Sequence, residues 1–398
     1  MTSSLRGDAA QSRLLLLAAI LFLSYLCVGV ALPVVPVFVT ERLAFGNAWA
    51  GLAVGIAFLS TILTRGHAGG LSDRRGAKPA VVVGLACYVA GAVTGWCAGL
   101  LTATPVPAFV VLLAGRLLLG LGESLVAVGV IGWGIALVGP DRSGRVLALV
   151  GAALYGALAV GGPLGLALFE RFGFAGTMAV GALLPALGLA ATWRLPGVPA
   201  HPQAQRPSIL GVVARIAPHG AIVCLQGIGF AAIGAFFVLH FRDQHWTQAG
   251  LGLTAFGSGF VLVRLLLGRL PDRIGGLPVA RASLAVEAAG QFLVWSAGRP
   301  WLALAGAFLT GLGCSMVYPA MGREVVQRVQ PHLRGTALGA FSAFQDLAYG
   351  LTGPLAGVLA DRAGYSSVFL VGGLAAVAGL LIALGLRRGA QFRELRRG

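Results

Sequence analysis

The chain alternates long apolar runs with short polar segments along its whole length. A helix needs about 20 mostly apolar residues to cross the hydrocarbon core of a bilayer, and runs of that length recur from residue 13 onward. The first run is too long for the core of a signal peptide, so we expect it to remain as a span. The pattern predicts twelve spanning helices: 13–39, 47–68, 79–100, 107–138, 143–168, 173–194, 216–240, 248–269, 279–298, 300–322, 335–360 and 365–386.

Composition supports an all-α integral membrane protein. Hydrophobic residues make up 57% of the 398 residues and charged residues only 11%, whereas about a quarter of the residues of a soluble domain are charged. The mean hydropathy is +0.87. The five cysteines lie inside apolar runs without metal-ligand spacing, so we expect reduced thiols, no metal and no cofactor.

A proline-rich polar stretch, "RLPGVPAHPQAQRPSILGVVAR" at 194–215, interrupts the pattern halfway. We therefore expect a six-helix bundle at 1–194, a cytoplasmic linker at 195–215 and a second six-helix bundle at 216–398 that ends in a short basic tail. Placing both termini in the cytoplasm puts most basic residues on that side, as the positive-inside rule requires. The net charge of +16 then reflects membrane orientation, and no nucleic-acid partner is expected.

The two halves repeat each other, which fixes the architecture. "TRGHAGGLSDRRGAKP" (64–79) matches "VRLLLGRLPDRIGGLP" (263–278), 199 positions later. From the fourth span onward the separation is 191: "GRLLLGLGESLV" (115–126) matches "GAFLTGLGCSMV" (306–317), and "GGPLGLALFERFGF" (161–174) matches "TGPLAGVLADRAGY" (352–365). We infer two pseudo-symmetric bundles.

A duplicated six-plus-six helix chain with this loop resembles the major facilitator superfamily (MFS), over nearly its whole length. Within the superfamily, "SYLCVGVALPVVP", "GHAGGLSDRRGAKP" and "LTGPLAG" together resemble the bacterial inner-membrane group of drug and sugar exporters. The resemblance implies a monomeric, multi-pass transporter of the bacterial inner (plasma) membrane. The superfamily's loop between helices two and three is supplied here by Gly70, Asp73, Arg74, Gly76 and Lys78, with a second copy at Asp272, Arg273 and Gly275.

These loops are expected to act as gates. A carboxylate is favoured near the positive N-terminal end of a helix, and in the superfamily such an acid faces helix eleven from the other half. The resemblance thus implies that Asp73 lies near Gly335 and Thr336, and that Asp272 lies near Gly144. The alternative is a basic loop that only sets orientation.

Charges deep inside spans cost free energy unless they are paired or face water. Arg116 lies in "GRLLLGLG", which resembles the superfamily's helix-four motif, whose arginine is associated with proton coupling; a structural ion pair is the alternative. Glu123 lies seven residues later on nearly the same face, too far along the helix for direct contact without long side chains.

Two more acids lie within the second half. Asp346 lies near mid-membrane, where the first half has Tyr155, so it is a candidate for binding substrate or protons in one half only. Glu287 lies at a depth comparable to Arg264, and we favour a structural ion pair between them over a role in coupling. Other polar side chains that are candidates for lining a cavity include Tyr25, Gln226 and Tyr349.

Gly162-Pro163 and Gly353-Pro354 place prolines inside spans five and eleven, where each removes a backbone hydrogen bond and kinks the helix. The pairs resemble the antiporter motif of exporting members, with only part of its glycine spacing. Many multidrug antiporters carry an acid in the first span, whereas this span has none before Glu41 at its outer end.

No enzymatic motif and no nucleotide-binding motif occurs in the chain. We expect a non-enzymatic secondary transporter that exports a small molecule in exchange for protons by alternating access. A proton-coupled importer or facilitator of a small polar nutrient is the alternative, and a sensor without transport activity is less favoured.

Overall fold

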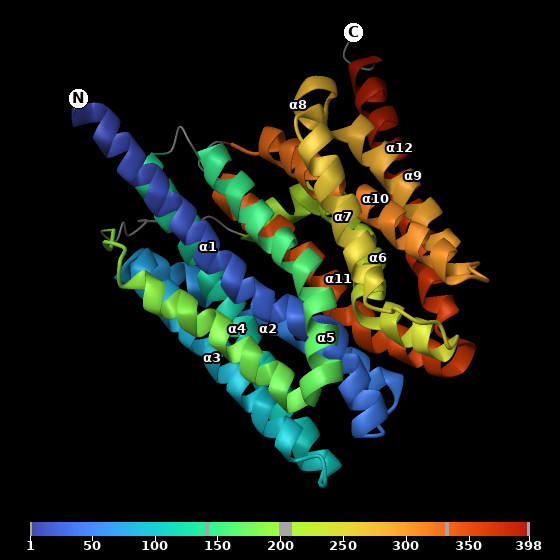
Figure 1. Cartoon of the computed structure of the whole chain (residues 1–398). Coiled ribbons are helices and arrows are strands. Elements are labelled where there is room, and N and C mark those ends of the chain that lie inside the picture. Colours follow the sequence, from blue (N-terminus) through green and yellow to red (C-terminus); the bar gives the residue numbers. More distant parts are fainter. Residues whose placement is uncertain (1, 140–142, 199–208, 331–333, 396–398) are drawn as a thin grey trace. The chain divides into compact units, whose positions relative to one another are not determined.

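The computed structural model describes residues 2–139, 143–198, 209–330 and 334–395 (Figure 1). Within these ranges the chain is helical and contains no β-strand. It divides into two compact units, here called the N-terminal unit (Met1–Ala204) and the C-terminal unit (Gln205–Gly398).

The N-terminal unit contains α1 (Thr2–Val37), the π-helix η1 (Phe38–Arg42), α2 (Asn47–Arg75), α3 (Ala77–Leu100), α4 (Pro105–Val138) and α5 (Ser143–Thr192). The C-terminal unit contains α6 (Ile209–Asp243), α7 (Leu251–Leu267), α8 (Leu270–Ile274), α9 (Gly276–Trp295), α10 (Pro300–Arg328), α11 (Arg334–Ala363) and α12 (Ser366–Leu395). The helix α6 begins at Ile209, inside the stretch 195–215 that the sequence pattern predicts to be a linker.

The described helices account for the twelve predicted spans. Eight of them are long and apolar enough to cross a membrane by length and composition alone. The remaining spans correspond to α7, α9 and α11 and to the second half of α5. Of these, α7 is only 17 residues long, and α9 and α11 carry the charged residues Arg281, Glu287 and Asp346.

Two predicted spans, 143–168 and 173–194, form the single helical element α5. Its continuity is broken at Gly173, which has a φ of 67° and a ψ of −174°, a conformation that favours glycine. Along α1, Phe22 faces Gly156 and Gly29 faces Gly161, whereas Ile20 faces Gly188 and Cys27 faces Gly181. The first part of α5 thus runs parallel to α1 and the second part antiparallel, so α5 folds back on itself at Gly173.

Each unit has its own apolar core. Leu17, Leu85 and Val126 are buried in the N-terminal unit, as are Ile222, Leu284 and Phe341 in the C-terminal unit. Leucines are also strongly exposed on outer helix faces, for example Leu63 and Leu265 at 81% and 78%. Exposed apolar faces of this kind are expected where helices meet lipid.

Close helix crossings recur at equivalent positions and confirm the internal duplication. A Cβ atom placed on Gly91 of α3 would lie 2.7 Å from the carbonyl oxygen of Gly115 in α4. The pair 199 and 191 positions later repeats this contact: a Cβ on Gly290 of α9 would lie 2.7 Å from the Gly306 oxygen in α10. Small residues permit this backbone contact, as in other membrane bundles.

Candidate functional site

Arg116 is a buried cation held by the backbone of a neighbouring helix. It lies on α4 and is 3% exposed. Its Nε donates to the Ala53 carbonyl at 2.9 Å and its Nη2 to the Val54 carbonyl at 3.3 Å, both on α2. These oxygens can accept a second hydrogen bond because a carbonyl has two lone pairs. Within the described chain Nη1 has no hydrogen-bond partner, so the guanidinium keeps one donor group for a further acceptor.

A small cavity adjoins Arg116 within the N-terminal unit. Its other lining residues are mostly small or apolar and come from α1, α3, α4 and α5: Cys27, Ala31, Val35, Gly91, Ala92, Gly95, Leu112, Leu119, Met178 and Gly181. Cys27, Tyr88 and Glu123 are near enough to interact with the guanidinium electrostatically. Glu123 is also buried, and the hydrogen bonds of Arg116 go to backbone carbonyls of α2.

Asp346 belongs to a polar and aromatic cluster on α11 of the C-terminal unit. It is 7% exposed. The preceding Gln345 donates from Nε2 to the Tyr349 hydroxyl at 2.7 Å, and the Tyr349 ring lies 4.5 Å from that of Phe230 on α6. A carboxylate, an amide and a phenol therefore lie close to an aromatic surface, an arrangement that can bind a polar ligand with a flat apolar face.

Glu287 does not pair with Arg264, and this interpretation of the sequence is wrong. The Arg264 Nη2 donates to the Ser315 carbonyl at 3.0 Å, and its guanidinium lies over the Phe260 ring. Glu287 does not point toward Arg264 on α7. Its helix, α9, packs against α10, α12 and α6, and the Glu287 side chain faces α6, because a Cβ on Gly229 would lie 2.5 Å from Glu287 Oε1. A similar depth along two helices does not bring their side chains into contact, because each helix is rotated so that its side chain faces a different neighbour.

The two loops that are expected to act as gates share one backbone geometry. Gly76 has φ and ψ of 92° and 162°, and Gly275 has 94° and 159°, values that only glycine adopts readily. Lys78 donates from Nζ to the Leu195 carbonyl at 2.7 Å. Arg74 and Arg273 are exposed, whereas Gly70 is buried.

The contacts expected for the two loop acids fall mostly on positions whose side-chain surroundings the structure does not describe. These positions are Asp73 and its expected partners Gly335 and Thr336, and Gly144, the expected partner of Asp272. Asp272 is 80% exposed and lies 3.7 Å from Arg323 of its own unit, measured from Oδ1 to Nε.

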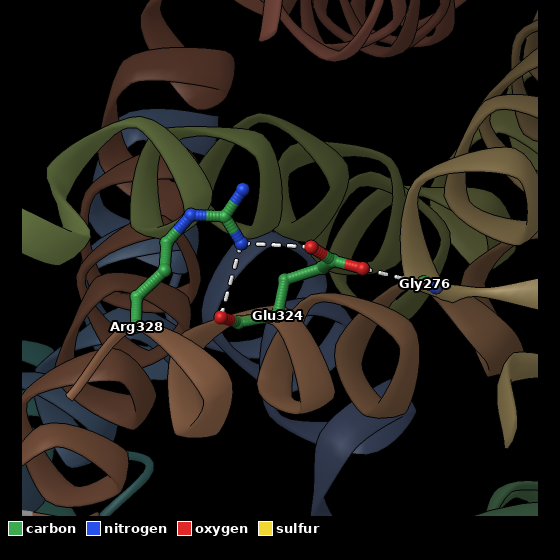
Figure 2. A network of polar contacts seen from close by, with 3 residues as sticks. All are labelled: Gly276, Glu324 and Arg328. Atoms are coloured by element: carbon green, nitrogen blue, oxygen red, sulfur yellow. Dashed lines mark hydrogen bonds and ion pairs between the residues drawn. The ribbon is translucent and has the colours of Figure 1, made fainter. Parts of the chain in front are cut away.

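Sequence reasoning missed Glu324, the acid that does meet a helix N-terminus. Its Oε1 accepts a hydrogen bond from the Gly276 N–H at the start of α9, at 3.1 Å, and its Oε2 accepts one from Arg328 Nη1 at 2.7 Å (Figure 2). A carboxylate there satisfies an unpaired helix donor and the helix dipole. Glu324 and Arg328 stand four residues apart on one helix, a signal that the sequence does contain.

The prolines of the two Gly-Pro pairs lie inside α5 and α11, at Pro163 and Pro354. The neighbouring Gly162 and Gly353 are buried. Close by, Gly161 packs directly on α1, because a Cβ there would lie 2.7 Å from the Gly29 Cα. Among the remaining cavity candidates, Tyr25, Gln226 and Tyr349 are all buried.

Comparison with known proteins gives consistent matches. A sequence model of the Major Facilitator Superfamily matches residues 17–239 and again residues 220–396. An uncharacterized MFS-type transporter of Salmonella typhimurium is 43% identical over 371 residues, which cover 92% of this chain and 94% of that protein. One from Pseudomonas aeruginosa is 40% identical over 376 residues, covering 92% and 91%.

Solved structures match over similar lengths. A D-xylose-proton symporter has a TM-score of 0.79 at 15% identity, covering 93% of this chain and 97% of that chain. The nucleoside transporter NupG has a TM-score of 0.71 at 19% identity, covering 94% and 98%. At these identities the shared feature is the fold.

Proposed function

Because the chain belongs to the major facilitator superfamily of membrane transporters, we propose that it exports a small molecule across the bacterial inner membrane in exchange for protons. The transporter is a monomer with both termini in the cytoplasm, and it works by alternating access. The chain carries no nucleotide-binding motif, which leaves an ion gradient or the substrate gradient as the energy source, and of these we propose the proton gradient.

The observation that carries this proposal is that Arg116 is buried and bonded to backbone while one of its nitrogens has no partner among the described residues. A cation inside a membrane bundle costs free energy and is usually retained for function. Here two backbone carbonyls fix the guanidinium while Nη1 has no partner among the described residues. A fixed cation beside a cavity can bind an anionic or polar group. The charge of the nearby Glu123 acts on the same guanidinium, so protonation of Glu123 changes how strongly Arg116 attracts an anion.

Asp346 supplies the second half of the proposal. A nearly buried carboxylate next to Gln345 and Tyr349 can bind either a proton or a polar substrate, which is the competition that antiport requires. The proton then bonds to a carboxylate oxygen when substrate leaves, and returns to water when substrate binds.

The direction of transport rests on α5. Its Gly-Pro pair and nearby glycines, Gly156, Gly161 and Gly165, resemble part of the motif of exporting members. Gly161 lies in backbone contact with Gly29 of α1. Pro163 gives this helix a position at which it can bend during alternating access.

The test uses inside-out membrane vesicles with an acidic interior, a pH-sensitive dye and a panel of drugs, sugars and metabolites. Wild type, Asp346→Asn and the control Glu170→Gln, which changes an exposed acid, are compared at equal amounts of inserted protein. We expect at least one compound to discharge the gradient in wild type and control but not in Asp346→Asn.

Other outcomes contradict parts of the proposal. Normal discharge by Asp346→Asn removes this residue from coupling. If no compound discharges the gradient while the protein is folded and inserted, antiport fails for the panel, and uptake of the same compounds without proton movement identifies a facilitator.

A further inference from the structure

The C-terminal unit contains a buried polar cluster away from Asp346, here called the Glu287 cluster. Its side chains come from α6, α9 and α10, and each is at most 3% exposed. The members are Gln226, Glu287, Gln291, Thr310 and Cys314.

Acceptors outnumber donors in this cluster. Gln291 donates from Nε2 to the Gly229 carbonyl at 3.1 Å and to Thr310 Oγ1 at 3.4 Å, while the Thr310 hydroxyl donates to the Gly306 carbonyl. Both Glu287 oxygens and the Oε1 atoms of Gln226 and Gln291 have no N–H or O–H donor in the described chain. The polar group that faces Glu287 is the Cys314 thiol, a weak donor.

Among the residues that the structure describes, no cation lies against Glu287 to balance a negative charge. The groups that face the cluster are neutral on every neighbouring helix: Gln226 and Gly229 on α6, Thr310 and Cys314 on α10, and Gly372 on α12. An ionised carboxylate buried without a partner is strongly disfavoured, because it loses its hydration and gains no compensating charge. One added proton removes the charge and supplies the missing O–H donor.

The matching region of the N-terminal unit solves the same problem differently. The duplication pairs Glu287 with Tyr88 and Cys314 with Glu123. These N-terminal residues also lie together, and they interact with Arg116. Ala307 replaces this arginine in the C-terminal unit, so no equivalent cation accompanies Glu287 among the described residues of this unit.

The space favours a proton over a larger cation. The Gly229 backbone lies against Glu287 Oε1, and that of Gly372 lies against the Gln291 side-chain amide. Glycine at both positions leaves these oxygens in contact with backbone rather than with open space. A metal ion would need several oxygen ligands around a site of its own.

We propose that Glu287 is a proton-binding site of the transport cycle. A proton from water bonds to one carboxylate oxygen when α6, α9 and α10 separate, remains there while the cluster is closed, and returns to water at the next opening. No other bond changes. The inference rests on the proposed proton-coupled transport and assigns one proton of that function to α9.

The experiment is infrared spectroscopy of the full chain reconstituted in lipid at neutral pH, recorded in H₂O and after mixing with D₂O. Wild type, Glu287→Gln, Glu287→Asp and the control Glu170→Gln are compared. We expect a carboxylic-acid C=O band that Glu287→Gln removes completely, that Glu287→Asp displaces, and that Glu170→Gln leaves unchanged. The band should shift in D₂O even without substrate. A protonated antiporter changes conformation without bound substrate, and each such change exposes the Glu287 proton to exchange with solvent.

A band spectrum unaffected by both Glu287 variants overturns the proposal, and so does a Glu287 band that never shifts in D₂O. Glu287→Asp keeps the test decisive if Glu287→Gln does not fold. The two proposals fail separately: absence of antiport in the vesicles contradicts the proposed function, whereas an absent or inert Glu287 band contradicts only this inference.

Discussion

Gly91→Ala and Gly290→Ala test the duplicated helix crossing. In wild type α3 meets α4 at Gly91, and α9 meets α10 at Gly290, with backbone against backbone. A Cβ at Gly91 would lie 2.7 Å from the Gly115 oxygen, whereas an ordinary contact of a Cβ with a heavy atom is 3.4–4 Å. The helices must therefore move apart by roughly 1 Å at the crossing.

The expected cost follows from this overlap. Overpacking of a tight interior costs about 1–3 kcal/mol, and the better helix propensity of alanine offsets up to about 1 kcal/mol. For 150–250 residues, 1 kcal/mol lowers the melting temperature by about 2–4 °C. With the full offset the net cost is up to about 2 kcal/mol, so we expect both variants to melt up to about 8 °C below wild type. Gly290→Ala should be the more severe, since its Cβ also meets Thr310 Oγ1 at 2.7 Å.

The assay is thermal unfolding of purified protein in detergent, followed by fluorescence at one heating rate, because such unfolding is often irreversible. Gly66→Ala on α2 is the matched control, since nothing lies within 4 Å of a Cβ there, and its melting temperature should stay equal or rise. Melting of Gly91→Ala and Gly290→Ala at the temperature of this control would refute the packing described for α3 with α4 and α9 with α10.

Three further predictions concern charge and backbone geometry. Arg116→Lys keeps the positive charge but loses one charged hydrogen bond, worth about 1.5–3 kcal/mol. In reconstituted vesicles the proton flux driven by a transported compound should therefore fall at least about tenfold. A flux equal to that of wild type would contradict this. Glu324→Gln keeps an acceptor for the Gly276 N–H but removes its charge at the helix start, worth about 0.3–1 kcal/mol; the melting temperature should fall slightly, and an equal fall in high salt would exclude an electrostatic cause. Gly76→Ala and Gly275→Ala should each cost about 1–3 kcal/mol through backbone strain, measured by thermal unfolding, and melting like wild type would contradict the glycine-only geometry.

The fold was largely predictable because its determinants are local or periodic. Apolar runs of spanning length marked the helices, and repeated glycines such as Gly76 and Gly275 disclosed the duplication. The bounds of α5 were not predictable, because helix continues on both sides of the turn at Gly173.

The polar contacts were harder to predict because they depend on helix rotation. Depth along the helices suggested an ion pair of Glu287 with Arg264, but these side chains point to different neighbours. The association of Glu287 with Cys314 and Gln226 joins three helices and leaves no local pattern. Glu324 was detectable from its spacing to Arg328, but its bond to Gly276 was not.

Proton exchange is the central claim, and its most direct measurement uses purified protein in lipid vesicles with the membrane potential clamped and no initial pH gradient. A compound identified in the panel is added outside, and external pH is recorded. Antiport predicts acidification outside as the compound enters and protons leave, with no change in protein-free vesicles. Alkalinisation would show symport, and uptake without any pH change would show a facilitator; either result would contradict the account.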